Sequence, residues 1–246
     1  MMKQSSILLV LVFCLFHAFI VVSAQVNPSC AINNSLIPNG DFNDISTGMP
    51  YTSGSLNFAP SPWSKFNTPD LSTETEVVFD VNTRLISDPS FDFNVSPTGG
   101  SFIGFRTSRF GLSTSDEGIY SALTVTDASE EVVIRFDYTE ANISGNSLSS
   151  GVRIQFRINA TTSSTGSLIA NVPNLTTTGG MHGVWEERII IFRPSDFGIS
   201  DGDTVNFYLG ANDSTGNIWA FVDGIGVVNT SSSCYCASGV NGPRFF

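Results

Sequence analysis

The sequence predicts an all-β protein built as an antiparallel two-sheet jelly-roll sandwich. Helical periodicity is absent, whereas short runs of alternating apolar and polar residues recur between segments rich in Gly, Ser, Asn, Thr and Pro. Such alternation is typical of antiparallel sheets that bury one face. Nine or so strands of this kind in one domain are most simply accommodated by two packed sheets.

The chain opens with a segment typical of a secretory signal peptide. A basic residue, Lys3, precedes an apolar run that ends in Val22-Ser23-Ala24. We therefore expect a signal peptide over 1–24, cleaved before Gln25. The apolar run is shorter than the roughly 20 residues that span a bilayer, and no later stretch is apolar enough. The sequence thus predicts a secreted protein, extracellular or at the cell surface, without membrane insertion.

The rest of the chain, 25–246, has the length of one β domain, with its core at about 36–228 and a short cysteine-containing tail. The whole chain carries 11 Lys and Arg against 22 Asp and Glu, and one of the lysines lies in the leader. This acidic balance disfavours nucleic acid and anionic membranes as partners.

Strands are expected wherever the alternation is regular. In 132–139 the residues at even positions are apolar or aromatic, and Arg135, Asp137 and Thr139 face the other way. Segments 141–150 and 161–166 are expected to be polar hairpin loops, and Tyr51–Asp70 a long irregular segment. The predicted strands are Glu76–Val81, Ser101–Arg106, Gly118–Thr126, Glu131–Thr139, Gly151–Asn159, Ser167–Val172, Trp185–Phe192, Thr204–Gly210 and Asn217–Val228.

The last predicted strand places a carboxylate among large apolar side chains. With a two-residue period, Asp223 shares its face with Trp219, Phe221, Ile225 and Val227. An unpaired buried carboxylate costs several kcal/mol or more, so Asp223 must either bind a proton or hold a partner.

Three cysteines follow the leader: Cys30, Cys234 and Cys236. Export permits disulfides. Cys234 and Cys236 are too close in sequence for an easy bond, so we expect Cys30 to pair with one of them and to tie the two ends of the domain together. The remaining thiol indicates pairing between copies in a disulfide-linked dimer, an unusual vicinal arrangement, or a chain that continues further in a longer relative.

Two motifs together resemble a known superfamily. The chain has LIPNGDFND (Leu36–Asp44) near its start, then Pro62-Trp63, and WAFVDGIGV (Trp219–Val227) near its end. This order is similar to that of the galactose-binding-like β-sandwiches, especially secreted carbohydrate-binding modules and related bacterial surface proteins. The resemblance covers most of residues 36–228, and it implies that Trp63, Trp185 and Trp219 pack in the core.

The resemblance also implies a partner for Asp223. In such modules the first-strand motif and the last-strand aspartate lie side by side, and with backbone carbonyls they often bind one structural calcium ion. The matching residues here are Asn43 and Asp223, and Asn43 stands where the family usually has a glutamate. Asp41 or Asp44 would restore the missing charge. The alternative is that Asp223 accepts hydrogen bonds from backbone N–H groups of the first-strand turn and holds no metal.

A sugar site requires exposed flat aromatic side chains and fixed polar groups. Arg153, Gln155 and Arg157 could equally form a solvated outer face. The side chains on central strands that could form such a site are Tyr120, Tyr208, Arg106, Arg153 and Gln155.

Nothing in the sequence identifies a catalytic centre. After the leader the chain has a single histidine, His182, without a serine or cysteine motif. Glu186 and Glu187 are adjacent on a strand, so they point to opposite faces, although other acidic pairs could meet in space. We therefore predict a non-enzymatic protein that binds polysaccharide or cell-surface glycan. The alternative is a structural or adhesive extracellular protein without a specific sugar site.

Overall fold

A computed structural model describes ten stretches of the chain, and the structural statements below concern these residues. The predicted signal peptide, His182 and most of the irregular segment Tyr51–Asp70 lie outside them. The described residues are 25–44, 61–67, 69–79, 82–88, 93–106, 117–142, 152–162, 164–173, 184–211 and 218–236. None of their helices has the length and apolarity that a membrane span requires.

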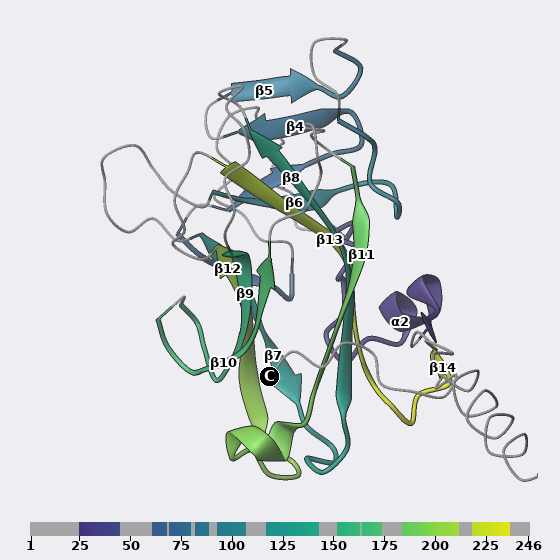
Figure 1. Cartoon of the computed structure of the whole chain (residues 1–246), viewed down its shortest axis with the longest axis vertical. Coiled ribbons are helices and arrows are strands. Elements are labelled where there is room, and N and C mark those ends of the chain that lie inside the picture. Colours follow the sequence, from purple (N-terminus) through teal and green to yellow (C-terminus); the bar gives the residue numbers. More distant parts are fainter. Residues whose placement is uncertain are drawn as a thin grey trace, which may run out of the picture.

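Two antiparallel five-stranded sheets form the two layers of the protein (Figure 1). The β12 sheet has the order β10-β9-β12-β7-β2, and the β13 sheet has the order β11-β8-β13-β6-β3. The β12 sheet comprises β2 (Ser64–Phe66), β7 (Gly118–Thr124), β9 (Val152–Ile158), β10 (Ser167–Pro173) and β12 (Thr204–Ala211). The β13 sheet comprises β3 (Asp70–Ser72), β6 (Phe102–Arg106), β8 (Val132–Asn142), β11 (Glu186–Phe192) and β13 (Ile218–Asn229).

The all-β sandwich and all nine predicted strands are confirmed. From β6 to β9 successive strands alternate between the sheets, as they do from β11 to β13, which is the jelly-roll pattern. The expectation of a hairpin at 141–150 is wrong, because β8 and β9 belong to different sheets. The loop at 161–166 does join a hairpin, since β9 and β10 pair directly. A further hairpin of β4 (Glu76–Phe79) and β5 (Asn82–Leu85) forms a sheet of its own, and Val77 packs it on the β13 sheet.

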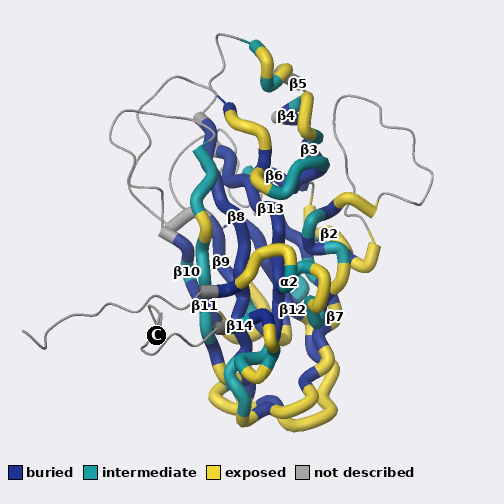
Figure 2. The backbone as a smooth tube through the Cα atoms, turned by 90° about the vertical axis from the view of Figure 1, so that its right-hand side faces the viewer, coloured by how far each residue is buried: buried dark blue, intermediate teal, exposed yellow. Residues whose placement is uncertain are grey.

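The main hydrophobic core lies between the two sheets, and buried residues are concentrated in their strands (Figure 2). Phe136 and Phe156 meet across this core, with ring centroids 4.9 Å apart. A second cluster, centred on Phe93, Phe102 and Phe221, covers part of the outer face of the β13 sheet. Trp63 belongs to the first cluster and Trp219 to the second, as expected, whereas Trp185 is only half-buried against the second.

The described residues also form a short helix, α2 (Pro28–Asn33), and a 3-10 turn, η1 (Pro194–Phe197), neither of which the sequence predicted. Asn27 caps the first turn of α2, since its side chain accepts a hydrogen bond from the Cys30 N–H at 3.0 Å, and proline follows at the first helical position. An Asn-Pro pair is a recognisable helix start, but a six-residue helix is too short to show periodicity. The helix packs on β13, where Ala31 lies against Gly226.

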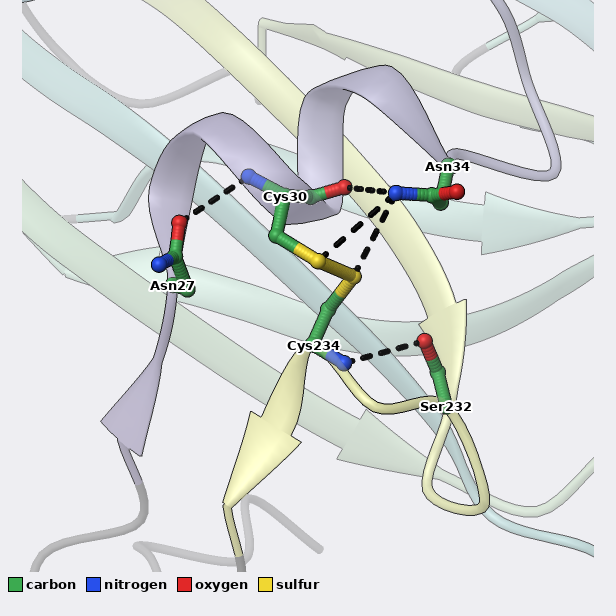
Figure 3. Close-up of a disulfide and its surroundings, with 5 residues drawn as sticks. All are labelled: Asn27, Cys30, Asn34, Ser232 and Cys234. Carbon is green, nitrogen blue, oxygen red and sulfur yellow. Dashed lines mark hydrogen bonds between the residues drawn. A yellow bond between two sulfur atoms is a disulfide. The ribbon is translucent and has the colours of Figure 1, made fainter.

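The two ends of the described chain are held together. β1 (Gln25–Val26) pairs with β14 (Tyr235–Cys236), and a disulfide joins Cys30 in α2 to Cys234 just before β14 (Figure 3). The predicted tie is therefore confirmed, with Cys234 as the partner. The side chain of Cys236 lies outside the described residues, so a disulfide-linked dimer stays a prediction.

Candidate functional site

A β-bulge in β13 sets the position of Asp223. Asp223 pairs with Asp137 of β8, but the next paired residue is Gly226, and Gly224 between them has φ +59. This positive φ favours glycine, and a Cβ there would also lie 2.8 Å from the Arg135 Nη1. The bulge inserts one residue into β13 and so shifts the alternation of its side chains. Odd-numbered residues before the bulge therefore point to the opposite face of the sheet from odd-numbered residues after it.

The predicted apolar face of Asp223 is therefore wrong beyond the bulge. Ile225 and Val227 point into the core between the sheets, whereas Trp219 and Phe221 belong to the cluster on the outer face. Asp223 lies on the outer face too and is fully buried there. The cover is supplied by the loop 93–101, which the sequence did not single out.

Three donors hold the Asp223 carboxylate. The hydroxyls of Ser96 and Thr98 donate to its Oδ2, and the N–H of Gly224 donates to Oδ1 at 2.6 Å. Burial raises the pKa of Asp223 to about 7, and these hydrogen bonds offset only part of the rise. The carboxyl group is thus poised to exchange a proton near neutral pH.

An ionic network lies beside it on β8. The Arg135 guanidinium donates two hydrogen bonds to the Asp137 carboxylate, at 2.6 and 2.7 Å, and a third to Glu187 at 2.8 Å. Its Nη1 also donates to the Gly224 carbonyl at 3.2 Å. Burial raises the pKa of Asp137, against the opposing effect of Arg135. The positive charge of Arg135 is therefore matched by carboxylates.

The first-strand motif and the last strand lie side by side, as the resemblance implied. The Ile225 N–H donates to the Gly40 carbonyl at 2.9 Å, and the Leu36 N–H donates to Val227 at 2.7 Å. A Cβ on Gly40 would lie 1.9 Å from the Ile225 carbonyl oxygen, so only glycine allows this approach. Gly40 of the turn therefore serves β13 as a hydrogen-bond acceptor, and the donors to Asp223 come from Ser96, Thr98 and Gly224 rather than from the turn.

The predicted calcium ligands do not converge on one point. Asn43 donates to Asp41 Oδ2 at 3.2 Å and accepts from the Ser101 N–H at 2.8 Å, whereas Asp44 bonds Asn39 through its backbone. Asp223 and Asn43 thus hold the same loop at different residues. No group of three His, Cys, Asp or Glu side chains in the described stretches is arranged to hold a metal ion.

These residues do not fit a calcium ion. Asp223 brings one carboxylate and two neighbouring hydroxyls, whereas calcium takes six to eight oxygen ligands, and the Arg135 guanidinium lies nearby. The structure does not test calcium binding, which stays a prediction of the sequence.

The two tyrosines predicted to bind sugar are cross-strand neighbours on the outer face of the β12 sheet. Tyr208 pairs with Tyr120 on one side and with Arg157 on the other, and Gln155 follows on the same face of β9. We call this surface the tyrosine face. Its described side chains are Ser64, Phe66, Gly118, Tyr120, Ala122, Thr124, Gln155, Arg157, Leu168, Asn171, Thr204, Asn206, Tyr208 and Gly210.

The two tyrosines differ in exposure. Tyr208 is fully buried, and its hydroxyl lies where a Cβ on Gly118 or Gly210 would stand, 2.4 and 2.3 Å away. The paired glycines therefore make room for its ring, and Phe66 packs against it at 6.3 Å. Tyr120 is half-buried. Of the two, Tyr120 is the one that can offer an aromatic surface to a ligand.

The remaining predicted residues are divided. Gln155 lies on the tyrosine face, but it is buried and its amide donates to the Ala211 carbonyl at 3.4 Å. Arg106 lies in the other sheet, so its assignment to this surface is wrong. The side chain of Arg153 lies outside the described residues.

Two buried glutamates at one end of the sandwich were not predicted. Glu140 points into the core beside Tyr138, whose hydroxyl donates to it at 2.6 Å. Glu117, from the opposite sheet, accepts a hydrogen bond from the Arg106 N–H at 2.7 Å. Glu140 was visible in the sequence as a carboxylate in phase with inward-facing Phe136 and Tyr138. Glu186 and Glu187 bind different arginines, Arg188 and Arg135, as their opposite orientation implied.

The comparisons with known proteins give structural likenesses only. No protein-family model matches the chain, and no curated protein is similar to it in sequence. The Stig cyclase Fisc from Fischerella sp. TAU, in complex with (3Z)-3-(1-methyl-2-pyrrolidinylidene)-3H-indole, is 11% identical with a TM-score of 0.51, over 78% of this chain and 94% of the cyclase. An apo cyclase from Fischerella sp. gives 11% and 0.50, over 78% and 93%.

A third similar structure is the module TmCBM61 in complex with β-1,4-galactotriose. It is 12% identical with a TM-score of 0.41, over 80% of this chain and 99% of the module, which is too distant to support an argument. Likeness at these identities shows the fold alone. Membership of the galactose-binding-like superfamily therefore stays a prediction.

The prediction that this protein is not an enzyme, which rested on the lack of a catalytic motif in the sequence, is wrong as a conclusion, because the comparisons give it no support. The two structures that share the sandwich with TM-scores of 0.50 and 0.51 are cyclases, which are enzymes. The architecture is thus no argument against catalysis, and the absence of a histidine motif was too narrow a criterion.

Proposed function

We propose that this protein is secreted and binds glycans, either polysaccharide or cell-surface sugar, through the tyrosine face. The observation that carries the proposal is the cross-strand row of Tyr120, Tyr208 and Arg157, with Gln155 beside it. An aromatic side chain next to fixed polar groups is what recognition of a sugar ring requires. The Cys30–Cys234 disulfide supports an extracellular location, because such bonds persist in oxidising compartments.

Replacing Tyr120 by alanine is expected to weaken glycan binding roughly tenfold, equivalent to about 1.4 kcal/mol. Tyr120 is half-buried, so the melting temperature should change little. Titration of the purified domain with a panel of polysaccharides measures the affinity, and Tyr120→Phe, which keeps the ring, is the matched control. Tyr208→Ala should instead lower the melting temperature by several degrees, because its ring is fully buried.

Two outcomes would contradict the proposal. Unchanged affinity in Tyr120→Ala would remove this surface from the binding site. Failure of the intact domain to bind any polysaccharide would favour a structural or adhesive role.

A second candidate function, hydrolysis of glycosidic bonds, is favoured by Glu117 and Glu140. Both carboxylates lie between the sheets at the same end of the sandwich, and a pair of carboxylates can supply the acid and the base of this reaction. Ala220 of β13 pairs with Glu140 on one side and with Phe105, next to Arg106, on the other. The backbone at Glu140 therefore lies two strand spacings, about 10 Å, from the backbone at Arg106, which Glu117 contacts.

Hydrolysis would be measured with chromogenic glycosides. Glu140→Gln keeps the shape of the side chain and should reduce turnover at least 100-fold through loss of proton transfer. Glu130→Gln, a change at a loop glutamate outside the sandwich interior, should leave turnover unchanged. A wild-type protein that cleaves none of the glycosides would exclude this candidate.

A further inference from the structure

The two sheets of the sandwich differ in charge. The five strands of the β12 sheet contain three basic residues, Lys65, Arg153 and Arg157, and no aspartate or glutamate. The chain as a whole has twice as many acidic as basic residues, so the acids are placed elsewhere. The strands of the β13 sheet hold six of them: Asp70, Asp137, Glu140, Glu186, Glu187 and Asp223.

Arg135 on β8 and Arg157 on β9, one in each sheet, show the effect of this difference in charge. Both are outward-facing arginines on long inner strands, but Arg135 binds the carboxylates of Asp137 and Glu187. Arg157 donates instead to the carbonyls of Thr165 and Gly166, at 2.7 and 3.1 Å, and to the Gln155 amide oxygen at 3.1 Å. These acceptors are neutral. They fix the guanidinium in place, and no acidic side chain in the described part of the chain is paired with it.

The geometry points to an anionic glycan as the ligand of the tyrosine face, a polysaccharide that bears carboxylate or sulfate groups. This inference rests on the proposed glycan-binding function and specifies its substrate class. Arg157 has five N–H donors and uses three within the protein, so two remain for an acidic group. Its cross-strand neighbour is Tyr208, and Tyr120 lies one strand further, so charge and aromatic surface lie within one sugar chain's reach.

The overall negative charge of the protein acts against such a ligand, but over a limited range. At physiological ionic strength charges are screened beyond about 8 Å, whereas stacked sheets lie about 10 Å apart. The acids of the β13 sheet are therefore largely screened from a ligand on the tyrosine face. The local field there is set by Arg157 and its uncharged neighbours.

The test measures binding of the purified chain to neutral and anionic polymers with comparable backbones: dextran, carboxymethyl-dextran and dextran sulfate, and galactan against polygalacturonate. In about 150 mM NaCl an anionic polymer should bind at least roughly tenfold tighter than its neutral counterpart. Raising the salt to about 500 mM should remove most of that difference without changing affinity for the neutral polymer. The carboxylated and sulfated arms decide which acidic group is preferred.

Arg157→Gln should remove most of the roughly tenfold preference for the anionic polymer over its neutral counterpart. Arg188→Gln is the control, because Arg188 is paired with Glu186 at 2.7 Å on the other sheet. A melting curve of each variant reports folding, and the salt dependence of the wild type tests the inference without any substitution. Equal binding of neutral and anionic polymers with no effect of Arg157→Gln would overturn the anionic preference alone. Binding to none of the polymers would overturn the proposed function together with it.

Discussion

The substitution Asp223→Asn is expected to remove most of the pH dependence of the free energy of unfolding between pH 4 and pH 7. Burial raises the pKa of Asp223 from its ordinary value of 3.8 to about 7 in the folded protein. In this range the folded state holds a proton that the unfolded chain has released, so stability falls as pH rises. The contribution of Asp223 is thus fully present below about pH 4 and is lost as pH rises through about 7. Each pKa unit is worth about 1.36 kcal/mol, so the expected loss is about 4 kcal/mol.

The measurement is urea unfolding of wild type and Asp223→Asn at several pH values in the presence of a chelator. The asparagine side chain has the shape of the protonated acid, so the contribution of position 223 should vanish, and the pH dependence that remains belongs to Asp137, whose pKa is also raised by burial. Asp127→Asn is the control, because hydrogen bonds from Ser129 lower the pKa of Asp127 and its contribution changes only below about pH 4. Parallel pH profiles of wild type and Asp223→Asn would show that the buried carboxyl does not titrate as described.

Asp223→Ala should destabilise the protein at every pH. The hydroxyls of Ser96 and Thr98 and the N–H of Gly224 would lose their acceptor, at about 1–3 kcal/mol for each donor left buried without one. The loop 93–101 would lose these hydrogen bonds to β13 at the same time and keep the packing of Phe93 on Phe221.

The same variants decide the calcium prediction. An ion bound to the folded state raises the melting temperature as its concentration rises. A higher melting temperature in millimolar calcium than in chelator, absent in Asp223→Asn, would establish the ion at this position. Identical curves for the wild type would mean that Ser96, Thr98 and Gly224 alone hold the carboxylate.

The strands could be predicted from the sequence because alternation is a local property. Val133 and Ile134 on β8, or Phe207 and Tyr208 on β12, point to opposite faces without reference to the rest of the chain. The bulge at Gly224 could not be predicted in this way. Without it, the alternation placed Ile225 on the face of Asp223, and a single inserted residue reversed that assignment.

The contacts of the candidate sites were harder to predict, because they join distant parts of the chain. Ser96 and Thr98 lie more than 120 residues from Asp223, in a loop with no periodicity. Glu117 meets the Arg106 N–H only because the two sheets close on one another. Tyr208 and Tyr120 were candidates on separate strands, and their pairing across β12 and β7 was not predicted; the burial of Tyr208 depends on Gly118 and Gly210, which are paired across the same two strands.

Loss of the Cys30–Cys234 disulfide is expected to destabilise the protein strongly. The bond closes a loop with a sequence separation of 204 residues. In the chain-entropy model, restricting an unfolded loop of that length stabilises the folded protein by about 5 kcal/mol. The double variant Cys30→Ala, Cys234→Ala should therefore unfold at much lower urea concentration, and Cys236→Ala is the matched control for removal of a cysteine.

The structure also indicates which elements would open first once the disulfide is removed. Cys30 lies in α2, whose Ala31 packs on Gly226 of β13, two residues beyond the bulge that positions Asp223. Hydrogen exchange of the double variant should thus show early opening of α2 and of the β1–β14 pair, with the β12 sheet still protected. Non-reducing peptide mapping gives the direct check: a free Cys30 thiol in the native protein would contradict the bond. Disulfide-linked dimers that disappear in Cys236→Ala would assign the third cysteine to pairing between copies.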